Sequence, residues 1–279
     1  MKDNINKKNI KKKSLKDMVL LDRFLFAEAV EDTVILKHIL NIILDEDLMF
    51  ISEYKIETEK EFRNHPAFRS IRLDVFVSGD GNGVYETEVQ QRNTGNLPKR
   101  SRFYQSMIDR TLLEVGSENF NEMKNVVLIM IMPFDLFGEG RYRYSFQMSC
   151  LENPQMQLAD GATRIFFNTH GEKQEGISEE LIELLHYMEH TPEVWDYKSK
   201  RIREIQERVN KIKLNHVLEV KYMQWWEEIA LEKAESKVEG QNRINELNIR
   251  LLQAGRTEDL LRSTEEAGYQ EKLLEEFQL

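Results

Sequence analysis

Acidic side chains flank a short glycine-rich segment in the first third of the sequence, and their types and spacing suit metal binding. Asp74 lies in residues 71–77 (IRLDVFV), and Glu86 and Glu88 lie in residues 84–90 (VYETEVQ). The six residues between these segments read SGDGNG. Mg²⁺ in proteins prefers one or two carboxylates together with waters and substrate phosphates. The pattern therefore suggests a metal site, provided that the two segments lie side by side.

A β-hairpin would bring the two acidic segments together. Both are rich in β-branched residues, and the glycine-rich stretch between them predicts a turn. Because side chains alternate along a strand, Arg72 and Asp74 share one face, and Glu86, Glu88 and Gln90 share one face. The apolar side chains of both strands must point to the core. The polar sets therefore point together.

The position of the turn decides which acids meet. A turn centred near Gly81 places Asp74 opposite Glu88, and a turn centred near Asp80 places Asp74 opposite Glu86. Opposed like charges destabilise a sheet, so a cation, either an arginine on the same face or a divalent metal, should offset the repulsion. The alternative is a solvent-exposed outer face that carries acids by chance. Spacing alone slightly favours this alternative.

The segments around the hairpin predict a mixed α/β core. Residues 125–132 (NVVLIMIM) form a continuous apolar run ended by Pro133, which is typical of a strand buried on both faces. Further strands are expected at residues 141–149 and 163–168. Helices are expected over residues 17–44 with a break near Glu31, over 98–114, and over most of 178–279, with breaks near Gly255 and Gly268. Such an order of strands and helices indicates an α/β fold.

Composition narrows the class of protein. The 279 residues include 39 Lys and Arg and 49 Asp and Glu, for a formal charge of −10. This balance argues against a protein that coats DNA through a general basic surface. Cys150 is the single cysteine, which excludes an intrachain disulfide and a thiolate zinc cluster and favours a cytoplasmic setting. The sequence contains neither a signal peptide nor a membrane-spanning apolar stretch.

Asp74, the glycine-rich turn and the tripeptide from Glu88 to Gln90 (EVQ) together resemble the core of the PD-(D/E)XK nuclease superfamily. The resemblance is closest to its recombination-promoting nuclease and transposase branch. Arg100 and Tyr104 fit the R-x-x-x-Y pattern of this branch, and the buried strand, the charged helices and the tail also match. The resemblance covers roughly residues 17–279. It implies a restriction-endonuclease-like mixed sheet flanked by helices, with a helical C-terminal extension.

The resemblance also implies a function, that of an Mg²⁺-dependent DNA endonuclease, with Mn²⁺ as an alternative cofactor. Asp74 and Glu88 would bind the metal. Gln90 stands where many members carry a catalytic lysine, and it would orient the attacking water. Arg100 and Tyr104 would contact the DNA backbone. The alternative for this pair is that Tyr104 packs in the core and Arg100 pairs with one of the acids.

Two departures from the family pattern bear on activity. Gln90 can neither carry a charge nor take a proton, unlike the lysine usual at this position. The segment from Asp22 to Glu28 lacks the lysine of the usual opening motif, although Glu28 and Glu31 are candidates for an additional metal ligand. A competing hypothesis is therefore a weak or inactive relative that serves as a DNA-binding or protein-interaction module. The clustered acids of the hairpin favour an active nuclease. The missing lysine and the net charge favour a weak or inactive relative.

The expected domain organisation has three parts. Residues 1–16 form a basic flexible tail, residues 17–175 the nuclease core, and residues 176–279 a helical region that is a candidate homodimer interface. Two residue pairs in the last part have less favoured functional interpretations. His186 and His190 have metal-ligand spacing, but helix-surface histidines are favoured. Trp225 and Trp226 could stack on bases, but packing is favoured.

Overall fold

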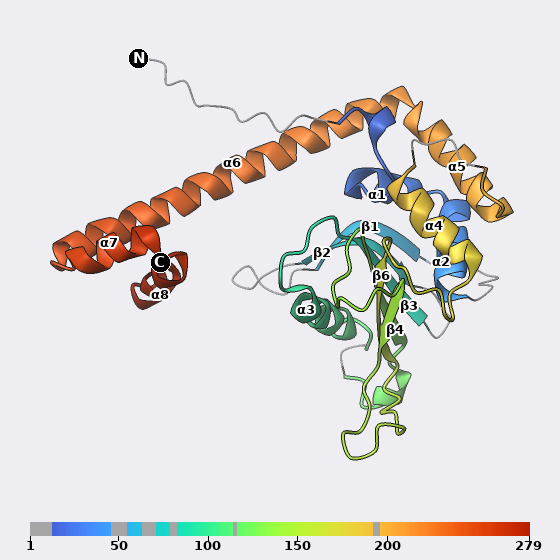
Figure 1. Cartoon of the computed structure of the whole chain (residues 1–279), viewed down its shortest axis with the longest axis horizontal. Coiled ribbons are helices and arrows are strands. Elements are labelled where there is room, and N and C mark those ends of the chain that lie inside the picture. Colours follow the sequence, from blue (N-terminus) through green and yellow to red (C-terminus); the bar gives the residue numbers. More distant parts are fainter. Residues whose placement is uncertain (1–12, 46–54, 63–70, 79–82, 114–115, 192–195) are drawn as a thin grey trace. The chain divides into compact units, whose positions relative to one another are not determined.

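A computed structural model of the chain describes residues 13–45, 55–62, 71–78, 83–113, 116–191 and 196–279. The chain divides into two compact units, one ending at Asn215 and the other starting at His216. The first unit contains a six-stranded sheet with helices on both faces (Figure 1). Its strands are β1 (Lys55–Phe62), β2 (Ile71–Ser78), β3 (Gly83–Val89), β4 (Asn125–Met132), β5 (Arg143–Phe146) and β6 (Ala162–Asn168).

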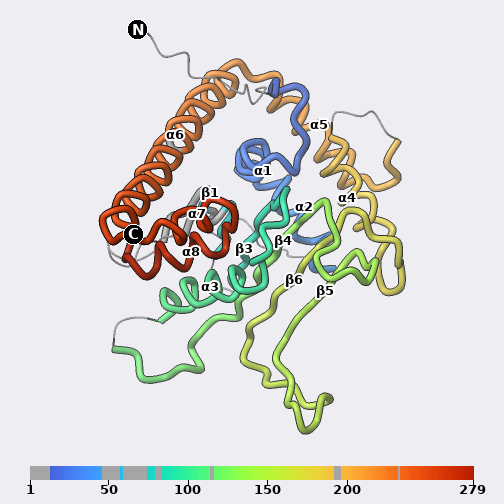
Figure 2. The backbone as a smooth tube through the Cα atoms, turned by 60° about the vertical axis from the view of Figure 1, so that its left-hand side comes forward, coloured from blue at the N-terminus to red at the C-terminus, as the bar shows by residue number. Residues whose placement is uncertain are grey.

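The sheet is mixed, in the strand order β1-β2-β3-β4-β6-β5. The pairs β1–β2, β2–β3 and β5–β6 are antiparallel, whereas β3–β4 and β4–β6 are parallel. Figure 2 shows β3, β4, β6 and β5 following one another in this order. The central position of β4 explains its continuous apolar sequence, because both of its faces are covered. The expected mixed α/β sheet with flanking helices is therefore confirmed.

Helix α3 (Leu97–Asp109) covers the sheet face on which the expected acids lie. Pro98 occupies its first turn, as the sequence predicts, and the helix ends at Asp109. Its buried residues, Leu97, Tyr104, Met107 and Ile108, pack against one apolar cluster on the sheet. The sheet residues of that cluster are Phe76, Val84, Val126, Leu128, Met130, Met132, Tyr144 and Phe166.

Helices α1 (Arg23–Val30), α2 (Thr33–Leu44) and α4 (Glu179–Glu189) lie on the other side of the sheet (Figure 1). Helix α1 packs on β1 and β2, and α5 (Lys200–Lys213) packs against α1, α2 and α4. The break near Glu31 is confirmed. Asp32 caps α2 by accepting hydrogen bonds from the backbone N–H groups of Val34 and Ile35, at 2.9 and 3.4 Å.

The segment before α1 is anchored to the end of α4. The Leu20 N–H donates to the Thr191 hydroxyl at 2.7 Å, and this hydroxyl donates to the Tyr187 carbonyl at 2.9 Å. The Leu21 N–H donates to the Met188 carbonyl at 3.0 Å. These bonds fix where α1 begins, which matters because its first residue reaches the candidate site.

Part of the predicted flexible tail is ordered, and that prediction needs correction. Residues 1–12 lie outside the described part of the chain. Residues Leu15–Asp17, however, form a 3₁₀ turn, and Leu15 is buried. The Lys213 ammonium donates to the carbonyls of Lys16 and Met18. The basic stretch therefore continues into the folded unit, because an apolar contact and a buried ammonium hold its last residues.

The second unit is helical throughout. It comprises α6 (His216–Gln253), α7 (Thr257–Glu265) and α8 (Ala267–Glu276), which share a small core of Leu247, Leu251 and Leu273. Gly255, with φ +71°, follows α6 as predicted. The second break lies at Glu266, close to Gly268 as predicted, and Gly268 itself is inside α8. None of the described helices has an apolar stretch long enough to cross a bilayer.

The boundary between the two units lies later than the boundary expected at residue 175. Helices α4 and α5 pack against α1 and α2 and so belong to the same compact unit as the sheet. Whether residues 176–279 act as a separate functional region stays a prediction. Trp225 and Trp226 are both half-buried on α6, and Trp225 stacks against Tyr222 with ring centroids 6.2 Å apart.

Replacing Thr191 by valine should weaken the anchor of α1. The change keeps the side-chain shape but leaves the buried Leu20 N–H without its acceptor, which costs about 1–3 kcal/mol. Urea unfolding should show this loss for Thr191→Val and little loss for Thr191→Ser, which keeps the hydroxyl. Equal stability of the wild type and Thr191→Val would show that the bond does not hold the segment.

Candidate active site

The β2–β3 hairpin brings the predicted acids together on one face. Phe76 pairs with Glu86 and Val75 with Thr87, so the register is that of a turn centred on Gly81. Continued by one residue, this register places Asp74 opposite Glu88, which is the first of the two predicted arrangements. The Val89 N–H also donates to the Asp74 carboxylate at 3.2 Å, which fixes the two strands to each other at this point.

The acidic face is buried, and the interpretation as a solvent-exposed outer face is wrong. Asp74 is 2%, Glu86 0% and Glu88 3% exposed. They share this face with Phe76 and with the apolar residues of β4 on which α3 packs. Acids at alternate strand positions are typical of a sheet face that is exposed to solvent. The structure covers both faces, with α3 over the acids.

Two arginines from different helices neutralise two of the acids. The Arg23 Nε atom lies 2.6 Å from the Asp74 carboxylate, and Arg23 is the first residue of α1. The Arg100 guanidinium, from α3, forms an ion pair with Glu88. Both arginines remain partly accessible, with side-chain exposures of 36% and 25%. The buried carboxylates are therefore held by cations that reach in from the surface.

Tyr104 supports Arg100 from one turn further along α3. The guanidinium lies 5.1 Å from the centre of the Tyr104 ring, a cation–π distance, and Tyr104 itself is buried. Burial raises the pKa of the Tyr104 phenol to about 12, and the Glu88 carboxylate contributes. The structure therefore agrees with the second predicted interpretation, in which Tyr104 packs in the core and Arg100 pairs with one of the acids. Contact of Arg100 or Tyr104 with DNA stays a prediction.

Glu86 is the acid without a counter-charge in hydrogen-bonding contact. Neither of its carboxylate oxygens has a hydrogen-bond partner among the described residues, although the side chain is fully buried. Burial raises the pKa of the Glu86 carboxyl well above its usual range, and the charges of Glu88 and Asp74 raise it further. An orphaned carboxyl of this kind is unusual in a folded core.

Glu88 is the acid whose ionisation falls closest to neutral pH. Burial raises the pKa of its carboxyl to about 7, and the adjacent Asp74 charge adds to this effect. The Arg100 charge acts in the opposite direction. Conversely, although burial lowers the pKa of the Arg100 guanidinium, the Glu88 carboxylate outweighs burial and raises it. On this buried face, the ionisation of each charged side chain therefore depends on the charges of its neighbours.

Gln90 follows the end of β3 and links the buried acids to the surface. Its side chain is half-buried, its backbone N–H donates to the Ile131 carbonyl at 2.9 Å, and its amide donates to the Arg92 carbonyl at 2.6 Å. The next residue, Gln91, donates to the Leu21 carbonyl and to the Asp22 carboxylate, at 3.1 and 2.8 Å. Gln91 thereby ties the end of β3 to the start of α1.

The other predicted ligands lie apart from this acidic face. Glu31 accepts a hydrogen bond from the Thr58 hydroxyl at 3.3 Å, and Glu28 lies half-buried on α1. His186 and His190 stack on each other with ring centroids 4.4 Å apart, and His186 contacts Tyr197. In the part of the chain that the structure describes, no three His, Cys, Asp or Glu side chains are arranged to hold a metal ion.

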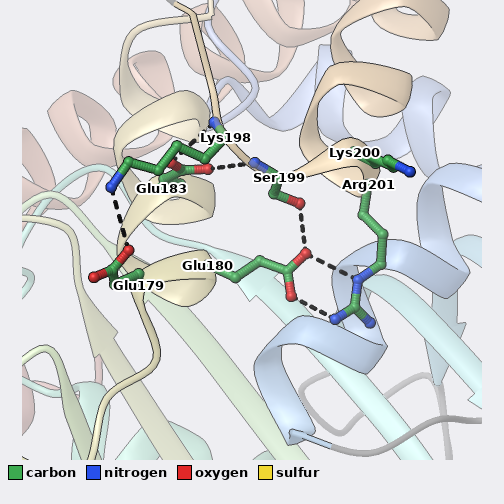
Figure 3. Close-up of a pocket in the computed structure, with 7 residues that line it drawn as sticks. All are labelled: Glu179, Glu180, Glu183, Lys198, Ser199, Lys200 and Arg201. Atoms are coloured by element: carbon green, nitrogen blue, oxygen red, sulfur yellow. Dashed lines mark hydrogen bonds and ion pairs between the residues drawn. The ribbon is translucent and has the colours of Figure 1, made fainter.

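A polar pocket between α4 and α5 is a second candidate, but all of its carboxylates accept hydrogen bonds or ion pairs from other lining residues (Figure 3). Glu180 accepts hydrogen bonds from Ser199 and Arg201. Glu183 accepts the backbone N–H groups of Lys198 and Ser199, at 3.1 and 3.0 Å, and so helps to cap α5. These contacts join two helices and leave the acidic face of the hairpin as the stronger candidate.

Arg23 is a site residue that the sequence does not indicate. It is 51 positions from Asp74 in the chain, and no local pattern marks a first-turn arginine as an ion-pair partner. Its position depends on the contacts of Gln91 and Thr191, which only the folded chain brings together. Arg72, the cation expected on this face from strand alternation, has a side chain outside the described set.

Stability should depend on pH through Glu88. Its carboxyl ordinarily titrates near 4.5 and in the folded chain near 7. Between these values the folded state keeps a proton that the unfolded state releases, so stability falls as pH rises through this window. Urea unfolding in EDTA from pH 4.5 to 8 should show a decline on the order of a few kcal/mol at most.

Glu88→Gln should remove this part of the pH dependence, because a glutamine does not titrate. Glu118→Gln, at an exposed position, is the matched control and should retain the wild-type slope. Parallel profiles for the wild type and Glu88→Gln would contradict the assignment.

Comparison with known proteins supports the fold. The family model described as "PD-(D/E)XK nuclease family transposase" matches residues 21–189, from the residue before Asp22 to the end of α4. No curated protein and no solved structure gives a significant match to the chain. The matched segment is more than half of the sequence and contains the whole sheet and the acidic face. The chain belongs to the PD-(D/E)XK nuclease family of transposases.

Proposed function

We propose that the chain is a metal-dependent DNA endonuclease of the recombination-promoting type, with its active site at the acidic face of the β2–β3 hairpin. The observation that carries this proposal is the burial of Asp74, Glu86 and Glu88 on one covered face. A purely structural sheet would place apolar residues there, because buried carboxylates cost free energy. Membership of a nuclease family supports the same conclusion.

The residues of this face fit a hard divalent cation. Asp74 and Glu88 would hold it, since they are opposed carboxylates with oxygen donors only, and Mg²⁺ commonly takes two carboxylates from a protein. The buried, unpartnered oxygens of Glu86 show that the face has a surplus of acceptors. Arg23 and Arg100 balance Asp74 and Glu88 in this structure, so a bound Mg²⁺ or Mn²⁺ would replace one kind of positive partner by another.

The bound cation would supply neutralisation of the scissile phosphate and a nucleophilic water at neutral pH. The side chains position the reactants. Hydrolysis adds water to phosphorus, breaks the bond to the leaving sugar oxygen and moves one proton from the water to that oxygen. Gln90, at the surface end of β3, would orient the water or a phosphate oxygen through its amide. It cannot accept the proton of the water, which would pass to solvent, and the leaving sugar oxygen would take a proton from solvent in return.

The partly exposed guanidiniums of Arg23 and Arg100 would bind phosphate oxygens of the DNA next to the site. Guanidinium groups suit this role because they donate paired hydrogen bonds to phosphate. Tyr104 is buried, so we propose that it positions Arg100 instead of contacting the DNA directly. This local pair of cations would allow an acidic protein to bind a polyanion at one place.

A weak or inactive relative is the second candidate. Two observations favour it: Gln90 occupies the usual lysine position, and both opposed acids already have arginine partners. In this case the chain would bind DNA or another protein, with the helical region of residues 176–279 as the candidate homodimer interface. Light scattering would test the dimer, and the cleavage assay that follows separates the two functions.

Purified protein should nick supercoiled plasmid with Mg²⁺ or Mn²⁺ and not with EDTA. Asp74→Asn and Glu88→Gln should each abolish nicking, because each removes one of the opposed carboxylates. Glu118→Gln is the matched control and should cleave like the wild type. Cleavage that survives in both site variants would place the activity elsewhere, and an inactive wild type would favour the second candidate.

Gln90→Ala should slow nicking by about tenfold to a hundredfold, since single hydrogen-bond donors in active sites commonly contribute this much or more. The effect should appear in the rate at saturating metal, because Gln90 is not a metal ligand in the proposal. A Gln90→Ala variant as fast as the wild type would show that the amide has no part in the reaction.

A further inference from the structure

We propose that one face of α6 is the surface through which two copies of the chain associate, with their α6 helices side by side and antiparallel. This inference goes beyond the proposed nuclease activity, and it narrows the candidate homodimer interface to named residues of one helix. It depends on three properties of α6, which are an exposed apolar stripe, a middle section that is exposed on all sides, and a symmetric order of residues along the stripe.

Apolar side chains form an exposed stripe along the whole length of α6. Six large apolar residues, each between 49% and 76% exposed, lie within about 50° of one line along the helix, at 3.6 residues per turn. They are Val217, Val220, Leu231, Val238, Ile249 and Leu252. On the opposite face, Leu247 and Leu251 pack with Leu273 of α8. Helix α6 therefore has two apolar faces, and the chain itself uses one of them as a core.

The middle of α6 is exposed on all sides. Residues 233–239, which make about two turns, are all exposed, and Gly240 follows them. Most helical stability in proteins comes from tertiary packing, and a glycine inside a helix weakens it. The helix has 38 residues and is about 57 Å long, whereas α7 and α8 pack near its C-terminal end (Figure 1). A second helix along the stripe would bury Leu231 and Val238 and so stabilise the middle.

The order of residues along the stripe identifies a second copy of the chain as the partner. Each apolar residue has an apolar counterpart equally far from the midpoint of α6, which lies between residues 234 and 235. The counterparts are Val217 with Leu252, Val220 with Ile249, and Leu231 with Val238. In an antiparallel pair of identical helices related by a two-fold axis, such residues lie at the same level. Apolar side chains would then meet apolar side chains at both ends and in the middle.

The polar residues of the stripe follow the same symmetry. Gln224 would lie level with Asn245, and Glu227 level with Asn242. An amide can hydrogen-bond to another amide or to a carboxylate, and polar residues at a helix seam specify register. A parallel pair would instead place Glu227 against its own copy at the seam, where like charges repel. The antiparallel pair brings Glu235 beside its own copy at the edge of the stripe, which provides a test of orientation.

Light scattering and analytical ultracentrifugation of the full chain test the dimer. The wild type should have the mass of two chains. Leu231→Glu combined with Val238→Glu should raise the dimer Kd at least about 100-fold, because it puts charges at the centre of the interface. Lys233→Glu combined with Ser236→Glu, on the opposite face of the same turns, is the matched control and should stay dimeric. Both variants should remain folded by circular dichroism, because the positions are exposed and glutamate is a good helix former.

Disulfide cross-linking tests the orientation. In a Cys150→Ser background, a chain with both Val220→Cys and Ile249→Cys should form a covalent dimer on oxidation, and either substitution alone should not. The two positions are about 43 Å apart along one helix, too far for a disulfide within one chain. A parallel pair would instead link each single-cysteine variant to its own copy. Glu235→Gln should lower the dimer Kd about twofold, because it removes the repulsion between the two copies of Glu235.

Three results would contradict the inference. A wild type that stays monomeric at about 100 µM would show that the stripe does not bind a second copy. A dimer that survives Leu231→Glu with Val238→Glu would place the interface elsewhere in the chain. Covalent dimers of the single-cysteine variants would rule out the antiparallel arrangement. The metal-dependent nicking assay uses variants of the β2–β3 hairpin, so the failure of one proposal can be distinguished from the failure of the other.

Discussion

The burial of three carboxylates beneath α3 is the constraint on which the site depends. Carboxylates on a covered sheet face need positive partners, and the fold provides them from both sides of the hairpin. Arg23 reaches Asp74 from α1, and Arg100 reaches Glu88 from α3. The start of α1 is in turn fixed by Thr191 and Gln91. The charges of the hairpin therefore link helices that are distant in sequence.

The same constraint connects the fold to the chemistry of a nuclease. A phosphodiester brings negative charge to a face that already carries buried acids, so binding requires cations between them. Arginines supply this charge in the structure, and a divalent metal would supply it during catalysis. Gln90 and Arg100 are half-buried and lead from the acids to the surface. In the proposed function, an acidic chain would act on DNA through a small, locally balanced site.

Much of this arrangement can be predicted from the sequence, because the signals are local. The glycine-rich turn predicts the hairpin and one of two registers, and the apolar run of β4 predicts a strand covered on both faces. The burial of the acidic face and the role of Arg23 cannot be predicted in this way. Both depend on how separate elements pack against one another, and the polar content of β3 suggests the opposite.

Anomalous diffraction from crystals grown with Mn²⁺ would test the central claim most directly, because it locates the cation without relying on turnover. We predict a peak between the carboxylates of Asp74 and Glu88, with at least one of the arginines Arg23 and Arg100 displaced from its acid. Full Mn²⁺ occupancy at another place, with both ion pairs intact, would contradict the account.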